Sequence, residues 1–204
     1  MRRGTVLFSV CVCLGLSGCS IGRPMPETTT YAVDLRTAAP VPANARFPGI
    51  LRVGDVRVAA PFAEAALVYR FSDVRYASDP YHAFVADPAS MLSDRIVQWL
   101  DHAGRFRAVA RPDSVQPARY LLEISVNEFY GDFRDAQPAA AVLAMQFSLI
   151  DQSGINPELV YERWISRSVS LAKASPELLV EGYGIALAQI LERVSSDLSE
   201  QLSP

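Results

Sequence analysis

Apolar and polar residues alternate along three successive segments in the second half of the chain. The segments are 120–129 (YLLEISVNEF), 142–150 (VLAMQFSLI) and 159–171 (LVYERWISRSVSL). Successive side chains of a strand point to opposite faces of a sheet, so this alternation is typical of half-buried strands. A glycine-containing turn, 151–158 (DQSGINPE), joins the second segment to the third and predicts that these two strands are partners. The chain must therefore build a sheet with one buried face and supply something to cover it.

A first helix is predicted, because both of its ends carry residues typical of helix termini. We expect this helix to cover that face. Asp87 is an N-cap acceptor, and Pro88 after it suits the first helical position. Gly104 suits a left-handed C-terminal cap. The apolar residues between them recur at helical spacing and form one stripe: Leu92, Ile96, Trp99, Leu100 and Ala103.

A second, long helix is predicted to begin at Ser175-Pro176-Glu177, which repeats the arrangement of cap and proline. Its apolar stripe consists of Leu179, Tyr183, Leu187, Ile190, Val194 and Leu198. Gly182 and Gly184 lie inside it and disfavour a helix by up to about 1 kcal/mol each relative to alanine, which we interpret as close contact with the sheet. The predicted fold is α+β: a single domain with a mostly antiparallel sheet and two main helices packed on one face.

The first half of the chain adds shorter strands. In 50–59 (ILRVGDVRVA) the apolar alternation slips by one residue at Gly54-Asp55, which predicts a bulge. The runs 66–71 (ALVYRF) and 74–77 (VRYA) flank Ser72-Asp73 and read as a hairpin. A short strand is also expected at 106–109.

The N-terminus has the layout of a secretory signal, with two arginines and then an apolar run too short to span a membrane. The run ends in Leu16-Ser17-Gly18-Cys19, which resembles the lipobox of bacterial lipoprotein precursors. We therefore expect a signal peptide at 1–18, a lipidated Cys19 followed by a tether at 19–30, and a folded domain at 31–204. Ser20 follows the cysteine in place of the aspartate that retains lipoproteins in the inner membrane, so the resemblance implies an outer-membrane anchor facing the periplasm.

Composition excludes several kinds of site from the mature chain. All three cysteines lie at or before Cys19, which excludes disulfides, thiolate metal sites and cysteine catalysis. Only His82 and His102 are available as histidine ligands, so no metal site is predicted. All 22 acidic residues follow Cys19 whereas two of the 19 basic ones precede it, so the mature side chains carry a net charge of −5. This acidic balance argues against nucleic acid as a partner.

The sequence contains no recognisable catalytic or nucleotide-binding motif, and no cofactor is predicted. A small hydrolase remains an alternative, and its candidate residues are Ser72, Asp79, His82, Asp87 and Ser90. His82 lies in a turn-like aromatic segment, whereas His102 lies in the last turn of the first helix, where a cation complements the helix dipole. Trp99 and Trp164 are both expected in the core.

Aromatic residues and arginines are dense in 69–84 (YRFSDVRYASDPYHAF). These residue types dominate protein interfaces. The segment is therefore a candidate partner-binding site, and its candidate residues are Tyr69, Arg70, Phe71, Arg75, Tyr76, Tyr81 and Phe84. The alternative is that these aromatic residues form the core face of the hairpin, and for Phe84 both roles stay open.

The order of these elements resembles the ABC-type transport auxiliary lipoprotein family. The resemblance rests on the lipobox and tether, then YAVDL (31–35), LRVGDVRVA (51–59), VYR (68–70), DPASMLSDRIVQWLDHAGRFRAV (87–109) and the terminal helix. It covers about 31–198. Many members have tryptophan near Phe84, so an interface built on that ring would differ here.

The resemblance implies a non-enzymatic accessory or docking subunit. Its partners would be a periplasmic protein of the mammalian-cell-entry (MCE) type and the ABC permease and ATPase of the same system, which moves phospholipids or other hydrophobic molecules between membranes. Whether the domain forms a homo-oligomer stays open. The alternative within the envelope is a lipoprotein that scaffolds the assembly of an outer-membrane partner.

Overall fold

A computed structural model of the chain describes residues 27–35, 47–134 and 138–201. The predicted signal peptide, Cys19 and most of the tether lie outside these residues. The elements, in chain order, are β1 (Thr29–Tyr31), β2 (Phe47–Val58), the 3-10 turn η1 (Ala60–Phe62), β3 (Ala66–Arg70), β4 (Tyr76–Phe84), α1 (Pro88–Ala103), β5 (Phe106–Ala110), β6 (Tyr120–Asp132), β7 (Ala140–Asp151), β8 (Glu158–Ser170) and α2 (Pro176–Gln201).

The eight strands form one sheet with β6 at its centre. On one side β6 pairs with β7, which pairs with β8, and these two long ladders are antiparallel. On the other side β6 runs parallel to β2 at its start and parallel to β3 at its end. The remaining pairings are the antiparallel β3–β4 hairpin and the parallel pairs β1–β4 and β2–β5. The prediction of a mostly antiparallel α+β domain is confirmed, with the parallel pairings confined to shorter ladders.

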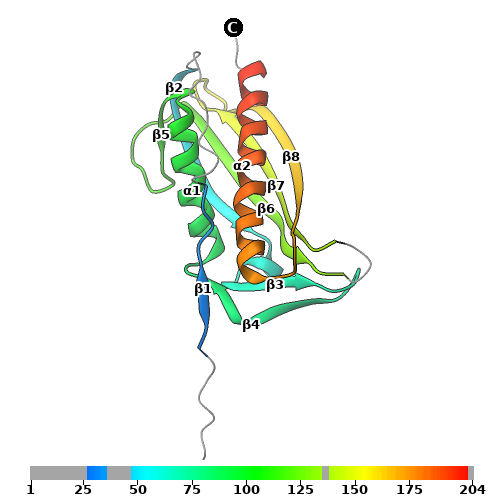
Figure 1. Ribbon diagram of the computed structural model, residues 1–204. Helices are drawn as coiled ribbons and strands as arrows, with labels where there is room; N and C mark the ends of the chain where they lie inside the picture. Colours follow the sequence, from blue (N-terminus) through cyan, green and yellow to red (C-terminus); the bar gives the residue numbers. More distant parts are fainter. Residues whose placement is uncertain (1–26, 36–46, 135–137, 202–204) are drawn as a thin grey trace, which may run out of the picture.

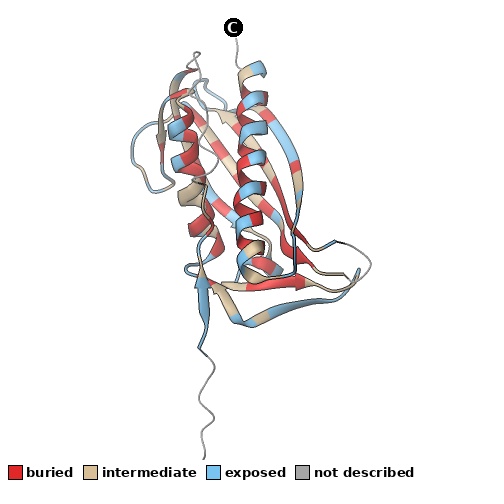
Figure 2. Ribbon diagram, in the orientation of Figure 1, coloured by how far each residue is buried: buried red, intermediate tan, exposed pale blue. Residues whose placement is uncertain are grey.

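Both helices lie on the same face of the sheet, as predicted (Figure 1). Helix α1 packs on β2 and β5, and α2 packs on β7 and β8. The buried residues concentrate where helices and sheet meet (Figure 2). They include Leu122, Ile124, Leu143 and Phe147 from the sheet.

The predicted ends of α1 are confirmed. The Asp87 side chain accepts a hydrogen bond from the Ser90 main-chain N at 2.9 Å, and Pro88 begins the helix. Gly104 adopts a left-handed conformation with φ 63°, which glycine adopts without steric cost. His102 lies in the last turn, and its Nδ1 is 2.7 Å from the Gln98 carbonyl oxygen.

Helix α2 begins as predicted, with the Ser175 hydroxyl accepting from the Leu178 main-chain N at 3.3 Å. Its apolar stripe is buried. Gly182 lies against the sheet as expected, because a Cβ there would come within 2.7 Å of the Ala141 Cβ on β7. The interpretation of Gly184 was wrong, since the atom that would meet its Cβ is the main-chain oxygen of Asp34, just after β1.

The predicted bulge and hairpin are also present. The pairing of β2 with β6 shifts register between Val53 and Val56, at Gly54-Asp55. β3 and β4 form the hairpin, but β4 runs on through the segment that we interpreted as turn-like. The register of β3 with β4 is irregular there, and Asp79 Oδ1 accepts from the main-chain N of Tyr81 at 2.8 Å and of His82 at 3.1 Å. A local turn is therefore embedded in the strand.

Candidate partner-binding surface

The structure divides the candidate residues of 69–84 between the core and the surface. Phe84 is only 5% exposed, and its ring stacks on Phe129 with centroids 5.0 Å apart. Tyr69 is also buried, stacks on Phe133 at 4.9 Å and donates its hydroxyl to Asp79 Oδ2 at 2.7 Å. Phe84 therefore packs in the core, which is one of the two roles left open for it. Neither the Phe84 ring nor the Tyr69 ring is accessible to a partner in this conformation.

The remaining candidates surround the hairpin connection. Tyr76 and Tyr81 are 41% and 48% exposed. Phe71 is half-buried against the core, and the Arg75 guanidinium lies 5.0 Å from its ring centroid. A cation over an aromatic face at this distance is an attractive contact. The Phe71 ring therefore holds the Arg75 side chain in place on the surface of the hairpin connection.

Arg70 is the centre of a second group of aromatic side chains. Its guanidinium lies 5.7 Å from the ring centroid of Tyr76 and 5.8 Å from that of Tyr130, and Nη1 donates to the Tyr130 hydroxyl at 3.2 Å. The hydrogen bond with Tyr130 raises the pKa of Arg70 further above its ordinary value. Phe62, from η1, stacks on Tyr130 at 5.9 Å. We call Phe62, Arg70, Tyr76 and Tyr130 the aromatic–arginine cluster.

Sequence reasoning missed Phe62 and Tyr130. Tyr130 ends the alternating pattern of β6, where it reads as one more core residue, and Phe62 lies in an alanine-rich stretch without periodicity. The pairing of β3 with the end of β6 brings Tyr130 to the hairpin, and Phe62 of η1 joins the group through contacts with the rings of Tyr130 and Tyr76.

The hairpin connection is fixed to the end of β6 by ion pairs. Arg134 donates to Asp73 Oδ1 at 2.7 Å and, through another nitrogen, to Asp132 Oδ2 at 2.7 Å. The Arg134 guanidinium lowers the pKa of Asp132 below its ordinary value. Charge-assisted bonds of this kind hold geometry well, so the connection that carries Arg75 and Tyr76 has a defined position.

The residues proposed for a hydrolase have structural roles. Asp79 Oδ2 lies 2.8 Å from His82 Nδ1 and also accepts from Tyr69. Burial raises the pKa of the Asp79 carboxyl, but the hydrogen bonds from Tyr69, the Tyr81 main chain and His82 outweigh it, so the pKa is lower than usual. This group joins β3 to β4.

The two candidate serines lie in other places. The Ser72 hydroxyl accepts from the main-chain N of Arg75 at 3.1 Å in the hairpin connection. Ser90 lies in the first turn of α1, where its main chain is capped by Asp87. Neither position forms a nucleophile–base pair with His82, so the contacts of these residues lend no support to a hydrolase.

The two tryptophans differ. Trp99 is buried, as predicted. The expectation that Trp164 is a core residue was wrong, since it is 56% exposed on β8. Its partner on β7 is Gln146, which lies between the buried Met145 and Phe147 and so faces away from the helices.

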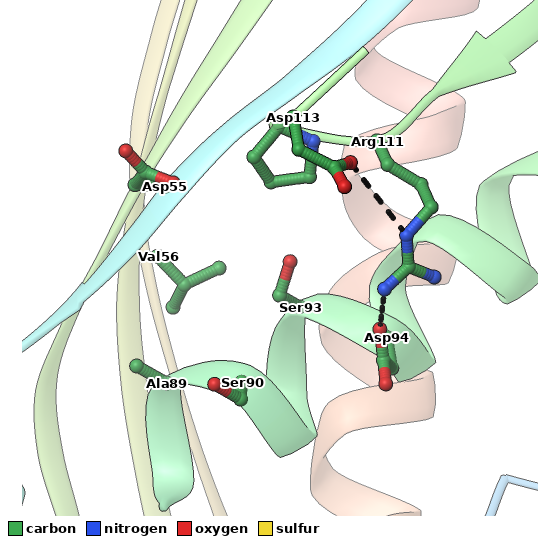
Figure 3. Close-up of a pocket in the computed structure, with 9 residues that line it drawn as sticks. Asp55, Val56, Ala89, Ser90, Ser93, Asp94, Arg111 and Asp113 are labelled. Carbon is green, nitrogen blue, oxygen red and sulfur yellow. Dashed lines mark hydrogen bonds and ion pairs between the residues drawn. The ribbon is translucent and has the colours of Figure 1, made fainter.

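A cleft of about 560 Å³ lies between the start of α1, the bulge of β2 and the connection after β5. Figure 3 shows Asp55 on the β2 side and Arg111 with Asp94 on the other. Arg111 forms an ion pair with Asp94, and its Nε lies 3.9 Å from Asp113 Oδ1. Because Arg111 already pairs with both carboxylates, we assign no ligand to this cleft.

Within the described parts of the chain, no group of three or more histidine, cysteine, aspartate or glutamate residues is arranged to hold a metal ion. Among the same residues, no helix is both long and apolar enough to cross a membrane.

Solved structures show the same fold at low sequence identity. A crystal structure of a DUF330-family protein from Xanthomonas campestris matches with a TM-score of 0.72 and 21% identity over 81% of this chain and 92% of that one. A second crystal structure, of an uncharacterised protein, matches with a TM-score of 0.66 and 19% identity over 85% of this chain and 99% of that one. A hypothetical protein from Chlamydia trachomatis matches at 0.53 and 10% identity over 76% and 98%.

No curated protein matches the chain. A family model does, over residues 31–195, which is most of the chain and includes every described strand except the first two residues of β1. Its description is the ABC-type transport auxiliary lipoprotein component, the same family that the order of sequence elements resembles. The chain belongs to the ABC-type transport auxiliary lipoprotein family.

Proposed function

We propose that this protein is a lipid-anchored docking subunit of an ABC-type transport system that works with an MCE-type periplasmic protein. The observation that carries the proposal is the family match over 31–195, preceded by the lipobox-like Leu16–Cys19. In the proposal Cys19 carries the lipid, the anchor is in the outer membrane, and the domain faces the periplasm. No catalytic step and no cofactor are assigned to it.

The position of β1 relates the anchor to the hairpin. β1 pairs with the end of β4, so the chain enters the domain at the end where the β3–β4 hairpin lies (Figure 1). The eight residue steps from Cys19 to Glu27 span at most ~29 Å. The hairpin would therefore stay near the membrane, and a partner that binds the hairpin must come about as close to the membrane as the tether allows.

We propose that the hairpin contacts the MCE-type partner through Arg70, Phe71, Arg75, Tyr76 and Tyr81. Arg75, Tyr76 and Tyr81 are exposed, whereas Arg70 and Phe71 are partly buried behind them. Tyrosine and arginine side chains that neighbours hold in place are suited to an interface, because little side-chain freedom is lost on binding. Arg70 and Arg75 are held by ring contacts and Tyr76 by the aromatic–arginine cluster. Tyr69 and Phe84 support this surface from beneath and are excluded from the contact itself.

Binding of the protein to the purified periplasmic region of an MCE-type protein from the same organism tests the proposal. We expect Arg75→Ala and Tyr76→Ala each to weaken binding about tenfold, which is ~1.4 kcal/mol, while the melting temperature is unchanged. Ile185→Ala is the matched control, because Ile185 is an exposed apolar residue of α2 and not of the hairpin. Unchanged affinity in both hairpin variants would place the contact elsewhere, and absence of wild-type binding would reject the MCE-type partner.

A further inference from the structure

The strand β8 forms an open edge of the sheet. It pairs with β7 along its length, and within residues 27–35, 47–134 and 138–201 its other side pairs with no strand. It is 13 residues long, contains neither proline nor lysine, and has its one register irregularity near its start, between Leu159 and Tyr161. Its charged residues are Glu158, Glu162, Arg163 and Arg167. In Figure 1 it lies at the margin of the sheet, beside α2. An edge of this length offers main-chain donors and acceptors to another extended segment.

One main-chain acceptor on the open side of this strand is used by a side chain. The Leu171 main-chain N donates to the Ala139 carbonyl oxygen, so by the alternation of an antiparallel ladder the Ser166 carbonyl points away from β7. Arg167 Nη1 donates to that carbonyl oxygen at 2.9 Å, and an added strand could take the place of this guanidinium.

The face of β8 away from the helices carries exposed apolar side chains that the domain itself does not cover. Trp164 is more than half exposed, and Leu159 is 55% exposed. The neighbours of Trp164 are polar, since Gln146 lies opposite and donates to Glu162 at 3.0 Å. A large ring among polar neighbours contributes little to folding and much to an interface.

The face of β8 toward α2 carries an excess of positive charge. Asp197 forms ion pairs with Arg163, whose Nε is 3.3 Å from Oδ2, and with Arg193, whose Nε is 2.8 Å from Oδ1, so one carboxylate neutralises only one of two guanidinium groups. Arg167, on the same face as Arg163, forms no ion pair with any described residue and bonds to its own strand. Acidic side chains would complement this face.

We propose that β8 is a strand-addition site for an extended segment of a partner protein. The segment would place apolar side chains beside Trp164 and acidic ones beside Arg163 and Arg167. This inference goes beyond the docking function proposed above, because it involves a different edge of the sheet and does not depend on the hairpin.

A second copy of this chain fits the edge less well than such a segment. In every antiparallel register centred on a residue from 162 to 167, Arg163 or Arg167 lies directly opposite or diagonal to an arginine of the other copy. Like charges in these positions are destabilising, and long side chains reach across the diagonal.

The test uses the full lipidated protein in detergent and a capped peptide of alternating valine and glutamate. We expect the peptide to slow amide hydrogen exchange in β8 and to shift the fluorescence of Trp164, a shift that Trp164→Phe abolishes. The matching valine–lysine peptide should bind about tenfold more weakly, because charge complementarity sets the preference. A valine–glutamate peptide with alternate amides methylated should not bind, because it lacks the main-chain donors.

Variants distinguish an effect of charge on peptide binding from loss of folding and from binding at another part of the sheet. Arg167→Glu should reverse the preference between the two peptides without unfolding the domain, since Arg167 bonds only to its own strand. Trp164→Ser should weaken peptide binding, whereas Tyr76→Ser in the hairpin should leave it unchanged. Exchange protection on β4 instead of β8, equal binding of the methylated peptide, or no binding would overturn the proposal. So would a dimer of the free protein that Trp164→Ser dissociates, because β8 would then serve a second copy.

Discussion

The main-chain oxygen of Asp34 occupies the space that a Cβ on residue 184 would fill. The segment that contains Asp34 is packed between the two helices. Val33 is fully buried, Arg95 Nε of α1 donates to its carbonyl oxygen at 3.0 Å, and the Tyr31 hydroxyl donates to Glu177 of α2 at 2.9 Å. The segment that follows the proposed anchor is thus held by both helices, and Gly184 makes room for it.

Gly184→Ala should therefore destabilise the domain although alanine favours a helix. The helix gains up to about 1 kcal/mol, but the new methyl group displaces the Asp34 main chain, and overpacking costs ~1–3 kcal/mol. Chemical denaturation should show a net loss, and limited proteolysis should show earlier cleavage within 29–35. The neighbouring exposed site is the control, where Ile185→Ala should change stability by less than ~0.5 kcal/mol. A more stable Gly184→Ala protein would contradict the packing described for this segment.

Phe84→Ala should act on folding. The ring stacks on Phe129 and lies 6.2 Å from Tyr183, so its removal leaves a cavity between β4, β6 and α2. Loss of a buried phenylalanine costs ~3–5 kcal/mol, which is a large part of the stability of one domain. Tyr81→Ala, at a half-exposed ring of the same strand, should unfold near the wild-type denaturant concentration. Similar midpoints for the two variants would mean that Phe84 is not a core residue.

Acid should weaken the domain through Asp151. Arg119 Nη2 donates to its Oδ2 at 2.8 Å and lowers the pKa of this carboxyl to about 2. Because the folded-state pKa is below the unfolded value, the unfolded chain binds the proton more readily. This stabilisation is present above about pH 4 and is lost as the pH falls toward about 2. The free energy of unfolding of Asp151→Asn, measured over that range, should fall less steeply than that of the wild type. Parallel curves would exclude this ion pair as a source of acid sensitivity.

Cys19→Ser should prevent lipidation and leave the protein as precursor or in a form without an anchor. Each buried CH2 of an acyl chain contributes about 0.8 kcal/mol to membrane binding, so the loss of all chains removes the anchor. Membrane fractionation and the mass of the N-terminal peptide measure both effects. If the serine variant still fractionates with the outer membrane as the wild type does, the domain has another means of attachment.

Local features of the fold were predictable because their causes are local. Asp87, Pro88 and Gly104 define α1 through hydrogen bonds and backbone angles within a few residues, and Gly54-Asp55 reveals the bulge by a slip in alternation. The residues 79–82 illustrate the limit. Asp79 does form the turn that its sequence suggests, yet the strand continues around it because β1 and β3 pair with its flanks.

The features that the sequence alone did not reveal depend on contacts between segments that are distant along the chain. Trp164 alternates in step with polar residues and is thus on the uncovered face, but hydrophobicity alone suggested the core. The partners of Gly184 and Arg70 come from segments 150 and 60 residues away, Asp34 and Tyr130. Which rings of the candidate segment 69–84 face outward therefore depended on pairings that no local pattern encodes.

The central position of β6 has a consequence for the order in which the parts of the chain fold. The last 80 or so residues form a contiguous unit, in which β6, β7, β8 and α2 contact one another in sequence order. β2 and β3 belong to the first half, and both pair in parallel with β6, although β2 also pairs with β5. Such non-local pairings form slowly. In the proposed function the chain is exported from its N-terminus, so these strands would emerge before β6. We expect the first half to need protection from aggregation until β6 has emerged, and a fragment ending before Tyr120 to remain without a stable fold.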